Sequence, residues 1–418
     1  MKARWTRRMV GLLRSRLPDP GFERVADPRR RRGRWPLATC LRTVVVAMLA
    51  GRQSFKQLED LTAELSDGAR GALGLRRRLP DTTARDMVAR VSPDELMQAL
   101  YRQVRAANRR GAIEPTHFPW GVLSMDGKDT VINGWDGKYA QRQGKRGHLR
   151  TITATLVSSD ARICVGAIPI PPNTNEIGHY KEALGQLCEA YRGLNLFRLV
   201  MYDAGACSED NARWTREQHL HYLMVLNAAQ PTLLAEAQAK LGSLGVADAS
   251  KVVTDGRIRY SLWLTAELAG FLNWSHLNTV VRLRREELNA DGTVRCSGER
   301  YFVTSLRRDA LDGRGWIDLL RSRWGVENNS HHLWDSTFKE DARTWINANP
   351  AGALNILLLR RIASNLMVIF RERTLRSEFA RLTPWHDLLR RTYNALISAT
   401  EELVANLRAR HPPPPLAA

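Results

Sequence analysis

The chain has 418 residues, of which 44% are hydrophobic and 25% are charged, as is typical of a globular protein with two or three domains. Lys and Arg number 63 against 43 Asp and Glu, so the formal net charge is +20. This surplus favours a nucleic-acid partner, although a basic protein of another class stays open. Five dispersed cysteines without metal-ligand spacing argue against zinc fingers and a disulfide framework. The apolar run Val44 to Ala50 is far too short to span a membrane, so we expect a cytoplasmic protein with no membrane partner.

The N-terminal part of the chain changes character near residue 36. Residues 1–35 are rich in arginine and include the run 29–32, which predicts a basic flexible arm. From Pro36 onward, apolar residues recur at helical spacing, and Ser92-Pro93-Asp94-Glu95 is typical of a helix start. Residues 36–115 are therefore predicted to form a helical domain. Short helices joined by tight turns are typical of DNA-binding modules, and equally of a plain helical bundle.

Alternating strands and helices follow. Gly121 to Met125 predicts a buried strand that runs into Asp126, and Phe197 to Tyr202 predicts another that ends at Asp203. The alternation predicts a mixed α/β sheet covered by helices. We expect six segments in all: a basic arm (1–35), a helical domain with a candidate DNA-binding role (36–115), the first part of an α/β core (116–244), a β-rich insertion (245–306), the second part of the core with the Glu327 helix (307–372), and C-terminal helices with a Pro-rich tail (373–418).

Three acidic residues are candidates for metal-dependent chemistry. Asp126 and Asp203 are both expected at strand ends, where open α/β sheets place functional groups. Two carboxylates that close repel each other, and a divalent cation such as magnesium relieves the repulsion. Glu327, on a later helix, could supply a third ligand, with Arg323 four residues before it on the same face. Each residue alone could equally be a turn residue or part of a solvated helix face.

Several short motifs occur in order along most of the chain. They are Arg34-Trp35-Pro36-Leu37, Leu79-Pro80-Asp81-Thr82-Thr83, Met125-Asp126-Gly127-Lys128, Asn175-Glu176-Ile177, Tyr202-Asp203-Ala204 and Arg321-Ser322-Arg323-Trp324-Gly325-Val326-Glu327-Asn328. Together they resemble the DDE transposases of bacterial insertion sequences, in the subgroup with a β-rich insertion before the third acid. The chain is also similar to the H-repeat-associated proteins related to them.

The resemblance implies an RNase H-like core that contains Asp126, Asp203 and Glu327 as catalytic residues and metal ligands. It implies two Mg²⁺ ions, for which Mn²⁺ can substitute, and cut-and-paste DNA transposition: hydrolysis at the element's ends, then attack of the freed 3′-hydroxyl on target DNA. The expected partner is double-stranded DNA, namely the terminal inverted repeats and the target. A homodimer assembled on DNA, in the nucleoid region of a bacterial cytoplasm, is implied as well.

The residues expected to contact DNA lie close to the three acids in sequence. They are Lys128, Lys145, Arg146, Arg321, Arg323, Asn328 and His331. The chain departs from the family pattern at Asn227, where a lysine is usual, and at Leu320 and Trp334, where related enzymes have Tyr and Lys. Two alternatives therefore stay open: an RNase H-like nuclease without strand transfer, and a catalytically impaired, transposase-derived DNA-binding protein.

Overall fold

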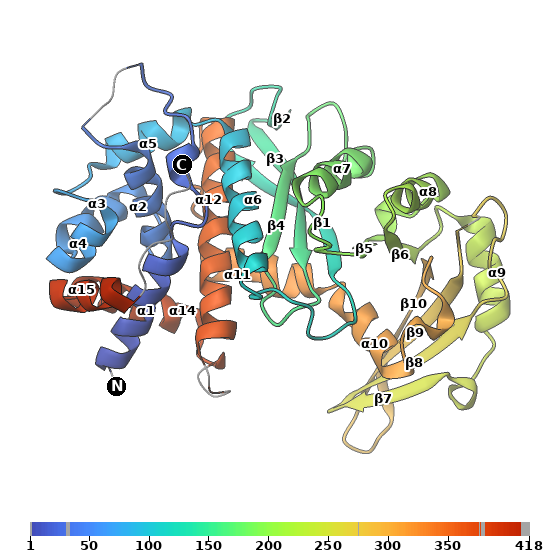
Figure 1. Ribbon diagram of the computed structural model, residues 1–418. Coiled ribbons are helices and arrows are strands. Elements are labelled where there is room, and N and C mark those ends of the chain that lie inside the picture. Colours follow the sequence, from blue (N-terminus) through green and yellow to red (C-terminus); the bar gives the residue numbers. More distant parts are fainter. Residues whose placement is uncertain (1, 31–33, 275, 376, 378–380, 411–418) are drawn as a thin grey trace.

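The computed structural model describes residues 2–30, 34–274, 276–375, 377 and 381–410 (Figure 1). Its N-terminal part is helical. The helices are α1 (Lys2–Arg16), α2 (Leu37–Leu49), α3 (Phe55–Glu64), α4 (Asp67–Leu73), α5 (Asp81–Arg90) and α6 (Pro93–Arg109). Serine caps start two of them: Ser54 Oγ accepts from the Gln57 N–H, and Ser66 Oγ from the Ala69 N–H. The predicted helical domain is therefore present as packed helices.

The arginine-rich N-terminus forms a packed helix over residues 2–16, where the sequence predicts a flexible arm. Met9 and Leu13 of α1 are buried, and the Trp5 ring meets Phe370 edge-on, with 5.2 Å between ring centroids. Helix α1 packs against α14 (Trp385–Ser398), near the other end of the chain. The expectation of flexibility is corrected because the apolar stripe of α1 finds its partners about 380 residues away. Residues 31–33 lie outside the described part of the chain.

The central sheet has an RNase H-like core. Its strands are β1 (Val122–Ile132), β2 (Ala140–Gln143), β3 (Arg146–Leu156), β4 (Cys164–Pro169), β5 (Leu199–Tyr202) and β6 (His221–Leu226). Strand β1 lies between β3, which is antiparallel to it, and β5, which is parallel. Strand β6 pairs in parallel with β5, and both β2 and β4 pair with β3. The predicted mixed α/β fold is confirmed by this order.

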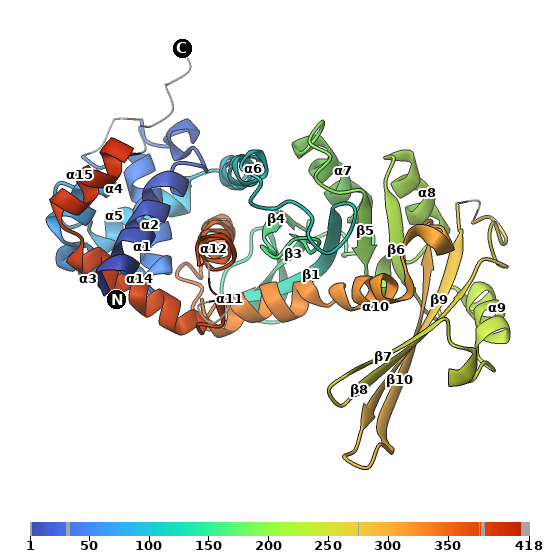
Figure 2. The same cartoon turned by 60° about the horizontal axis from the view of Figure 1, so that its bottom comes forward.

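The β-rich insertion continues the same sheet. It consists of β7 (Lys251–Asp255), β8 (Ile258–Thr265), β9 (Thr279–Leu288) and β10 (Val294–Thr304), all antiparallel to one another. Strand β10 pairs antiparallel with β6, with Tyr301 opposite Leu226 and Thr304 opposite Leu223. The described strands thus form one ten-stranded sheet. Figure 2 shows β7–β10 as long strands at the end of the molecule away from α1–α6.

Helices cover both faces of the core sheet because its strands are apolar on both sides. Alternate residues of β5 belong to different cores: Leu199 packs with Trp316 of α10 (Gly313–Ser322), whereas Val200 belongs to the larger core on the opposite face. The other covering helices and the helical segments after the insertion are α7 (Tyr180–Ala190), α8 (Glu209–Glu217), α9 (Pro231–Leu241), α11 (His332–Ser336), α12 (Pro350–Ile369), α15 (Glu401–Arg410) and the π-helical segments η5 (Val326–His331) and η6 (Phe370–Thr374).

Helix α12 is the central element of the larger core. The stretch Pro350–Thr374 is long and apolar enough to cross a bilayer, with a mean hydropathy of 1.6, but that apolar window is entirely buried inside the protein. It contacts α2, α5, α6 and β4. The Asn355 side-chain amide donates to the carbonyls of Val88 and Val91 at the end of α5. This burial identifies the stretch as a core helix that joins the helical region to the sheet.

Candidate functional site

Asp126 lies inside strand β1, where the sequence predicts it at a strand end. Strand β1 continues to Ile132 through its pairing with β3, and Asp126 stands opposite Thr153. Its parallel pairing with β5, however, stops at Ser124. Asp126 therefore lies two residues beyond that pairing, and Asp203 one residue beyond the end of β5. Because neighbouring parallel strands end at one edge, the two aspartates lie side by side.

A third carboxylate, that of Glu176, joins them. Asp126, Glu176 and Asp203 each offer a carboxylate oxygen, and these oxygens lie within 4.8 Å of one another; all three residues are partly buried. We call them the strand-end cluster. Glu176 is in the turn before α7, where sequence reasoning assigned it no role. The only signal was its place in the motif Asn175-Glu176-Ile177, because nothing local shows that this turn meets β1 at Asp126 and the end of β5.

Hydrogen bonds orient each carboxylate of the strand-end cluster. The Tyr202 hydroxyl donates to Glu176 Oε1 at 3.0 Å, and the Gly205 N–H donates to Asp203 Oδ1 at 2.9 Å. The Gly127 N–H donates to Asp126 Oδ1 at 3.0 Å. Gly127 also makes room, because a Cβ there would lie 2.2 Å from Glu176 Oε2. The motif Asp126-Gly127 thus serves the close approach of Glu176 as well as the strand.

Among the residues that the structure describes, the carboxylates of Glu176 and Asp203 have no ion pair with a Lys or Arg. Burial raises the pKa of Glu176, and the nearby Asp203 adds to the shift. Burial and Glu176 together raise the pKa of Tyr202, so its hydroxyl stays a donor. In the described part of the chain, no Lys or Arg nitrogen lies within 4.0 Å of a Glu176 or Asp203 carboxylate oxygen. Hard oxygen ligands crowded in this way fit a divalent cation.

His331, at the end of η5, lies beside the Asp126 carboxylate. Its Nδ1 lies 3.7 Å from Asp126 Oδ2, and its Nε2 lies 2.8 Å from Thr153 Oγ1. Because the Thr153 hydroxyl proton is donated to the Asp126 carbonyl at 3.0 Å, Nε2 is assigned as the protonated ring nitrogen. Burial lowers the pKa of His331 to about 3, with Arg361 and Lys128 adding to the effect. His331 is therefore a neutral imidazole that faces the first acid.

The third predicted acid, Glu327, lies in η5, and its side chain is outside the described residues, as is that of Asn328. One expectation is corrected: Arg323 and Glu327 do not share an α-helix, because α10 ends at Ser322 and η5 begins at Val326. Segment η5 packs on β1 and β3, where the Ser330 and Thr155 hydroxyls are 3.0 Å apart. It therefore lies beside the strand that contains Asp126.

The predicted DNA-contacting residues fall into two groups. Lys145 and Arg146 are exposed at the β2–β3 turn. Arg321 and Arg323 are engaged within the protein: Arg321 pairs with Asp255 at 2.5 Å, and the buried Arg323 lies over the Trp324 ring. Lys128 is nearly buried, with its Nζ 3.0 Å from Asp335 and 3.3 Å from Asp341.

Lys128 forms ion pairs with two members of a second group of acids. Asp335, Glu340 and Asp341 also offer carboxylate oxygens within 4.8 Å of one another. We call them the lysine-filled cluster. Glu340 is fully buried and forms a two-point ion pair with Arg361, at 2.5 and 2.8 Å. Burial opposes the charge of Glu340, but Arg361 outweighs it and holds the pKa of Glu340 below its usual value. Lys128 and Arg361 therefore offset most of the negative charge of this cluster.

Comparison with known proteins gives a consistent picture. The family described as the transposase DDE domain matches residues 121–366, and the family described as DDE_Tnp_1-associated matches residues 21–104. A solved structure of the piggyBac transposase synaptic complex with hairpin DNA is 13% identical, with a TM-score of 0.44. The alignment covers 93% of this chain and 77% of that chain. No match is found among the curated proteins.

Proposed function

This chain belongs to the family of transposases with a DDE domain, and from that premise we propose that it performs cut-and-paste transposition. It hydrolyses a phosphodiester at each end of a mobile DNA element and joins the freed 3′-hydroxyls to target DNA. The observation that carries the proposal is the strand-end cluster: acids 77 positions apart, Asp126 and Asp203, meet at one edge of an RNase H-like sheet. Glu176 joins them from a third segment.

We propose that Asp126 and Asp203, with Glu327 from η5, hold two Mg²⁺ ions, for which Mn²⁺ can substitute. Glu176 is proposed as a further ligand. Two observations support Glu176 as a ligand: the three carboxylates are crowded together, and the small Gly127 leaves room for Glu176. When bound, such ions activate a water or hydroxyl nucleophile and stabilise charge at phosphorus. The chain's own contribution is orientation: the Tyr202 hydroxyl positions Glu176, and the Gly205 N–H positions Asp203.

The proposed DNA partners are the element's terminal inverted repeats and the target. Two copies of the chain pair the two ends, in the nucleoid region of a bacterial cytoplasm. The exposed Lys145 and Arg146 are proposed phosphate contacts, since Lys and Arg at a turn beside the core can reach a DNA backbone. DNA contact is also proposed for the remaining predicted residues, Lys128, Arg321, Arg323, Asn328 and His331. Of these, Lys128 and Arg321 would have to exchange an internal ion pair for a phosphate.

The test compares two aspartates under one substitution. Asp203→Asn keeps the size of the side chain but removes a charged ligand. Asp210→Asn removes an exposed acid on α8, which pairs with Lys181, and is the matched control. With Mg²⁺ and DNA carrying the inverted repeats that flank the reading frame, the natural chain and Asp210→Asn should cleave. Asp203→Asn should show no cleavage above background while binding the repeats with unchanged affinity.

Strand transfer is tested separately with pre-cut ends that already carry a 3′-hydroxyl. The proposal expects joined products with a plasmid target. Cleavage without joining would identify a nuclease instead. A natural chain that binds the repeats but never cuts them would identify a DNA-binding protein descended from a transposase. Cleavage that survives in Asp203→Asn would overturn the assignment of the site.

A further inference from the structure

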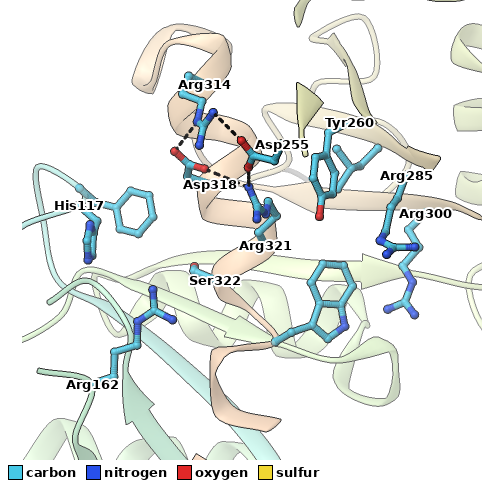
Figure 3. A pocket seen from close by; sticks show the side chains of 13 residues that line it. His117, Arg162, Asp255, Tyr260, Arg285, Arg300, Arg314, Asp318, Arg321 and Ser322 are labelled. Carbon is cyan, nitrogen blue, oxygen red and sulfur yellow. Dashed lines mark hydrogen bonds and ion pairs between the residues drawn. The ribbon is translucent and has the colours of Figure 1, made fainter. Parts of the chain in front are cut away.

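A cavity of about 780 Å³ lies between α10, the insertion strands β7–β10 and the loop at His117 (Figure 3). We call it the arginine pocket. It is lined by Arg162, Arg285, Arg300, Arg314 and Arg321, with aromatic walls that include Tyr260 and Trp324. Figure 3 shows Arg162 on one side of α10 and Tyr260, Arg285 and Arg300 on the other. None of the functional residues predicted from the sequence, apart from Arg321, belongs to it.

Part of the charge in the arginine pocket is structural. Arg321 pairs with Asp255 at 2.5 Å, and Arg314 pairs with Asp318 at 2.9 Å and with Asp255 at 3.7 Å. The dashed lines in Figure 3 trace this network. It ties the end of β7 to α10, and its two cations and two anions cancel. These four residues therefore hold the insertion against α10. They do not account for the other three arginines of the pocket.

The remaining three arginines have no such partner. In the described part of the chain, no carboxylate oxygen lies within ion-pair distance of Arg162, Arg285 or Arg300. Arg300 lies over the Trp324 ring at 5.0 Å, and Arg162 is half-buried. Burial lowers the pKa of Arg162 although the charges of Asp160 and Glu372 oppose the shift, and an anion in the pocket would offset the remaining cost. Three guanidinium groups around one cavity, none with a carboxylate at ion-pair distance, are a phosphate-binding arrangement.

The size and walls of the cavity favour one strand over a duplex. Its volume is in the range of small-ligand sites, enough for a few nucleotides and too small for the width of a double helix. Trp324 and Tyr260 offer ring surface beside the arginines. Basic grooves with aromatic side chains are how proteins hold single strands without reading their sequence.

The arginine pocket is joined to the strand-end cluster by a short piece of chain. The Ser124 hydroxyl, two residues before Asp126, donates to the Arg323 carbonyl at 3.0 Å. Trp324 follows directly, and η5 then leads to His331 beside Asp126. A strand held in the pocket is therefore held by the segment that docks on the acid-bearing strand.

We propose that the arginine pocket binds a short stretch of one DNA strand, with phosphates on Arg162, Arg285 and Arg300 and a nucleotide against Trp324. This inference rests on the proposed function, since it takes DNA as the substrate. It adds a second contact region, on the insertion, that holds one strand apart from its complement while the strand-end cluster cuts.

The test uses charge-matched double variants of the full chain. Arg285→Gln with Arg300→Gln removes two pocket arginines. Arg295→Gln with Arg307→Gln removes two exposed arginines in and just after β10 that already pair with Glu287 and Asp309. Binding of a labelled single strand and of the same sequence as a duplex is followed by fluorescence anisotropy over a range of salt. Thermal unfolding of each variant checks that the fold is retained.

The pocket variant should bind the single strand about tenfold more weakly, and its logarithmic salt dependence should fall by about 1.4, or 0.7 per lost phosphate contact. The control variant should change both quantities much less. Arg162→Gln, on the opposite side of α10, should give about half the fall in slope. If both double variants lose single-strand affinity equally, the binding reflects the general surface charge and not the pocket, and the inference is overturned.

Other outcomes separate this inference from the proposed function. If the natural chain binds and cuts its repeats while the pocket variant binds single strands normally, only the pocket inference fails. If the natural chain binds no DNA of either form, the proposed function fails with it. A pocket variant that loses self-association in sedimentation while its salt dependence is unchanged would assign the pocket to a protein surface instead of a strand.

Discussion

The strand-end cluster and the lysine-filled cluster are alike in having three acids, and their surroundings differ. Each brings three carboxylates together, with oxygens within 4.8 Å of one another. Asp335 and Asp341 share the Lys128 ammonium group, and Glu340 pairs with Arg361. Around Glu176 and Asp203, the described partners are instead a tyrosine hydroxyl and a backbone N–H.

This difference shows why a count of acids does not find a metal site. A cluster whose charge is largely offset by the protein's own cations stabilises the fold, as Lys128 does by joining β1 to α11 and to the segment that follows it. A cluster left with little internal compensation stores repulsion that a bound cation relieves. Four changes test that distinction, in order of decreasing effect.

The largest effect is expected from breaking the buried pair of the lysine-filled cluster. Arg361→Met leaves the Glu340 carboxylate fully buried without its cation, which should lower the free energy of unfolding by about 3–5 kcal/mol. Denaturant unfolding followed by tryptophan fluorescence measures the loss. Because Arg361 also lies over Trp334, at 3.3 Å, the emission should shift as well. A loss of unfolding free energy below about 1 kcal/mol would show that the pair does not stabilise the fold.

The double variant Arg361→Met with Glu340→Leu is the control, and it should recover most of the loss because neither charge is then buried. The pH dependence follows from the lowered pKa of Glu340. A depressed folded-state pKa gives stability that is fully present above the unfolded value, about 4.3, and is lost as pH falls through the folded value. The double variant should therefore show a weaker fall in stability below pH 4 than the natural chain.

Next in size is the effect of Glu176→Gln on cation binding. Removing one charged ligand from the strand-end cluster should weaken Mn²⁺ binding by about 10–100-fold, measured by calorimetry on the full chain. Glu182→Gln is the matched control, because Glu182 is an exposed acid in the first turn of α7 that contacts His179. Unchanged Mn²⁺ affinity in Glu176→Gln, with the control also unchanged, would limit Glu176 to a structural role.

Gly127→Ala should act through the same carboxylate, with a smaller effect. The new Cβ would lie 2.2 Å from Glu176 Oε2, so Glu176 must move away, and Mn²⁺ affinity should fall about tenfold. In the double variant with Glu176→Gln, the two losses should not add, because both remove one interaction. Additive losses would show that Gly127 acts on another part of the site.

The smallest effect is expected from Lys128→Met. The substitution removes the ammonium group from between Asp335 and Asp341 and should cost about 1 kcal/mol, because both acids remain partly solvated. Millimolar Ca²⁺ should then stabilise the variant more than the natural chain, because in the variant it can occupy the emptied cluster as well as the strand-end cluster. If Ca²⁺ stabilises both proteins equally, internal cations are not what separates the two clusters.

The sequence alone was sufficient for the family, for the mixed α/β class and for the position of Asp203 directly after a strand. The periodicity of buried strands and helices is local, so the segments around Asp126 and Asp203 could be read directly from the chain. The motifs add order and spacing, which the match over residues 121–366 supports. The packing of α1 could not be predicted, because its apolar stripe is buried only by contacts with α14 and Phe370, which lie far away in the sequence.

Tertiary structure decided which acids meet. Glu176 and Glu340 look alike in the sequence, as single glutamates in polar segments. The first enters the strand-end cluster because its turn meets β1 at Asp126 and the end of β5, and the second is buried against Arg361 of α12. Local pattern determines what each segment becomes, whereas the charge environment of a side chain depends on residues tens to hundreds of positions away. That environment separates a carboxylate that can hold a cation from one that supports the fold.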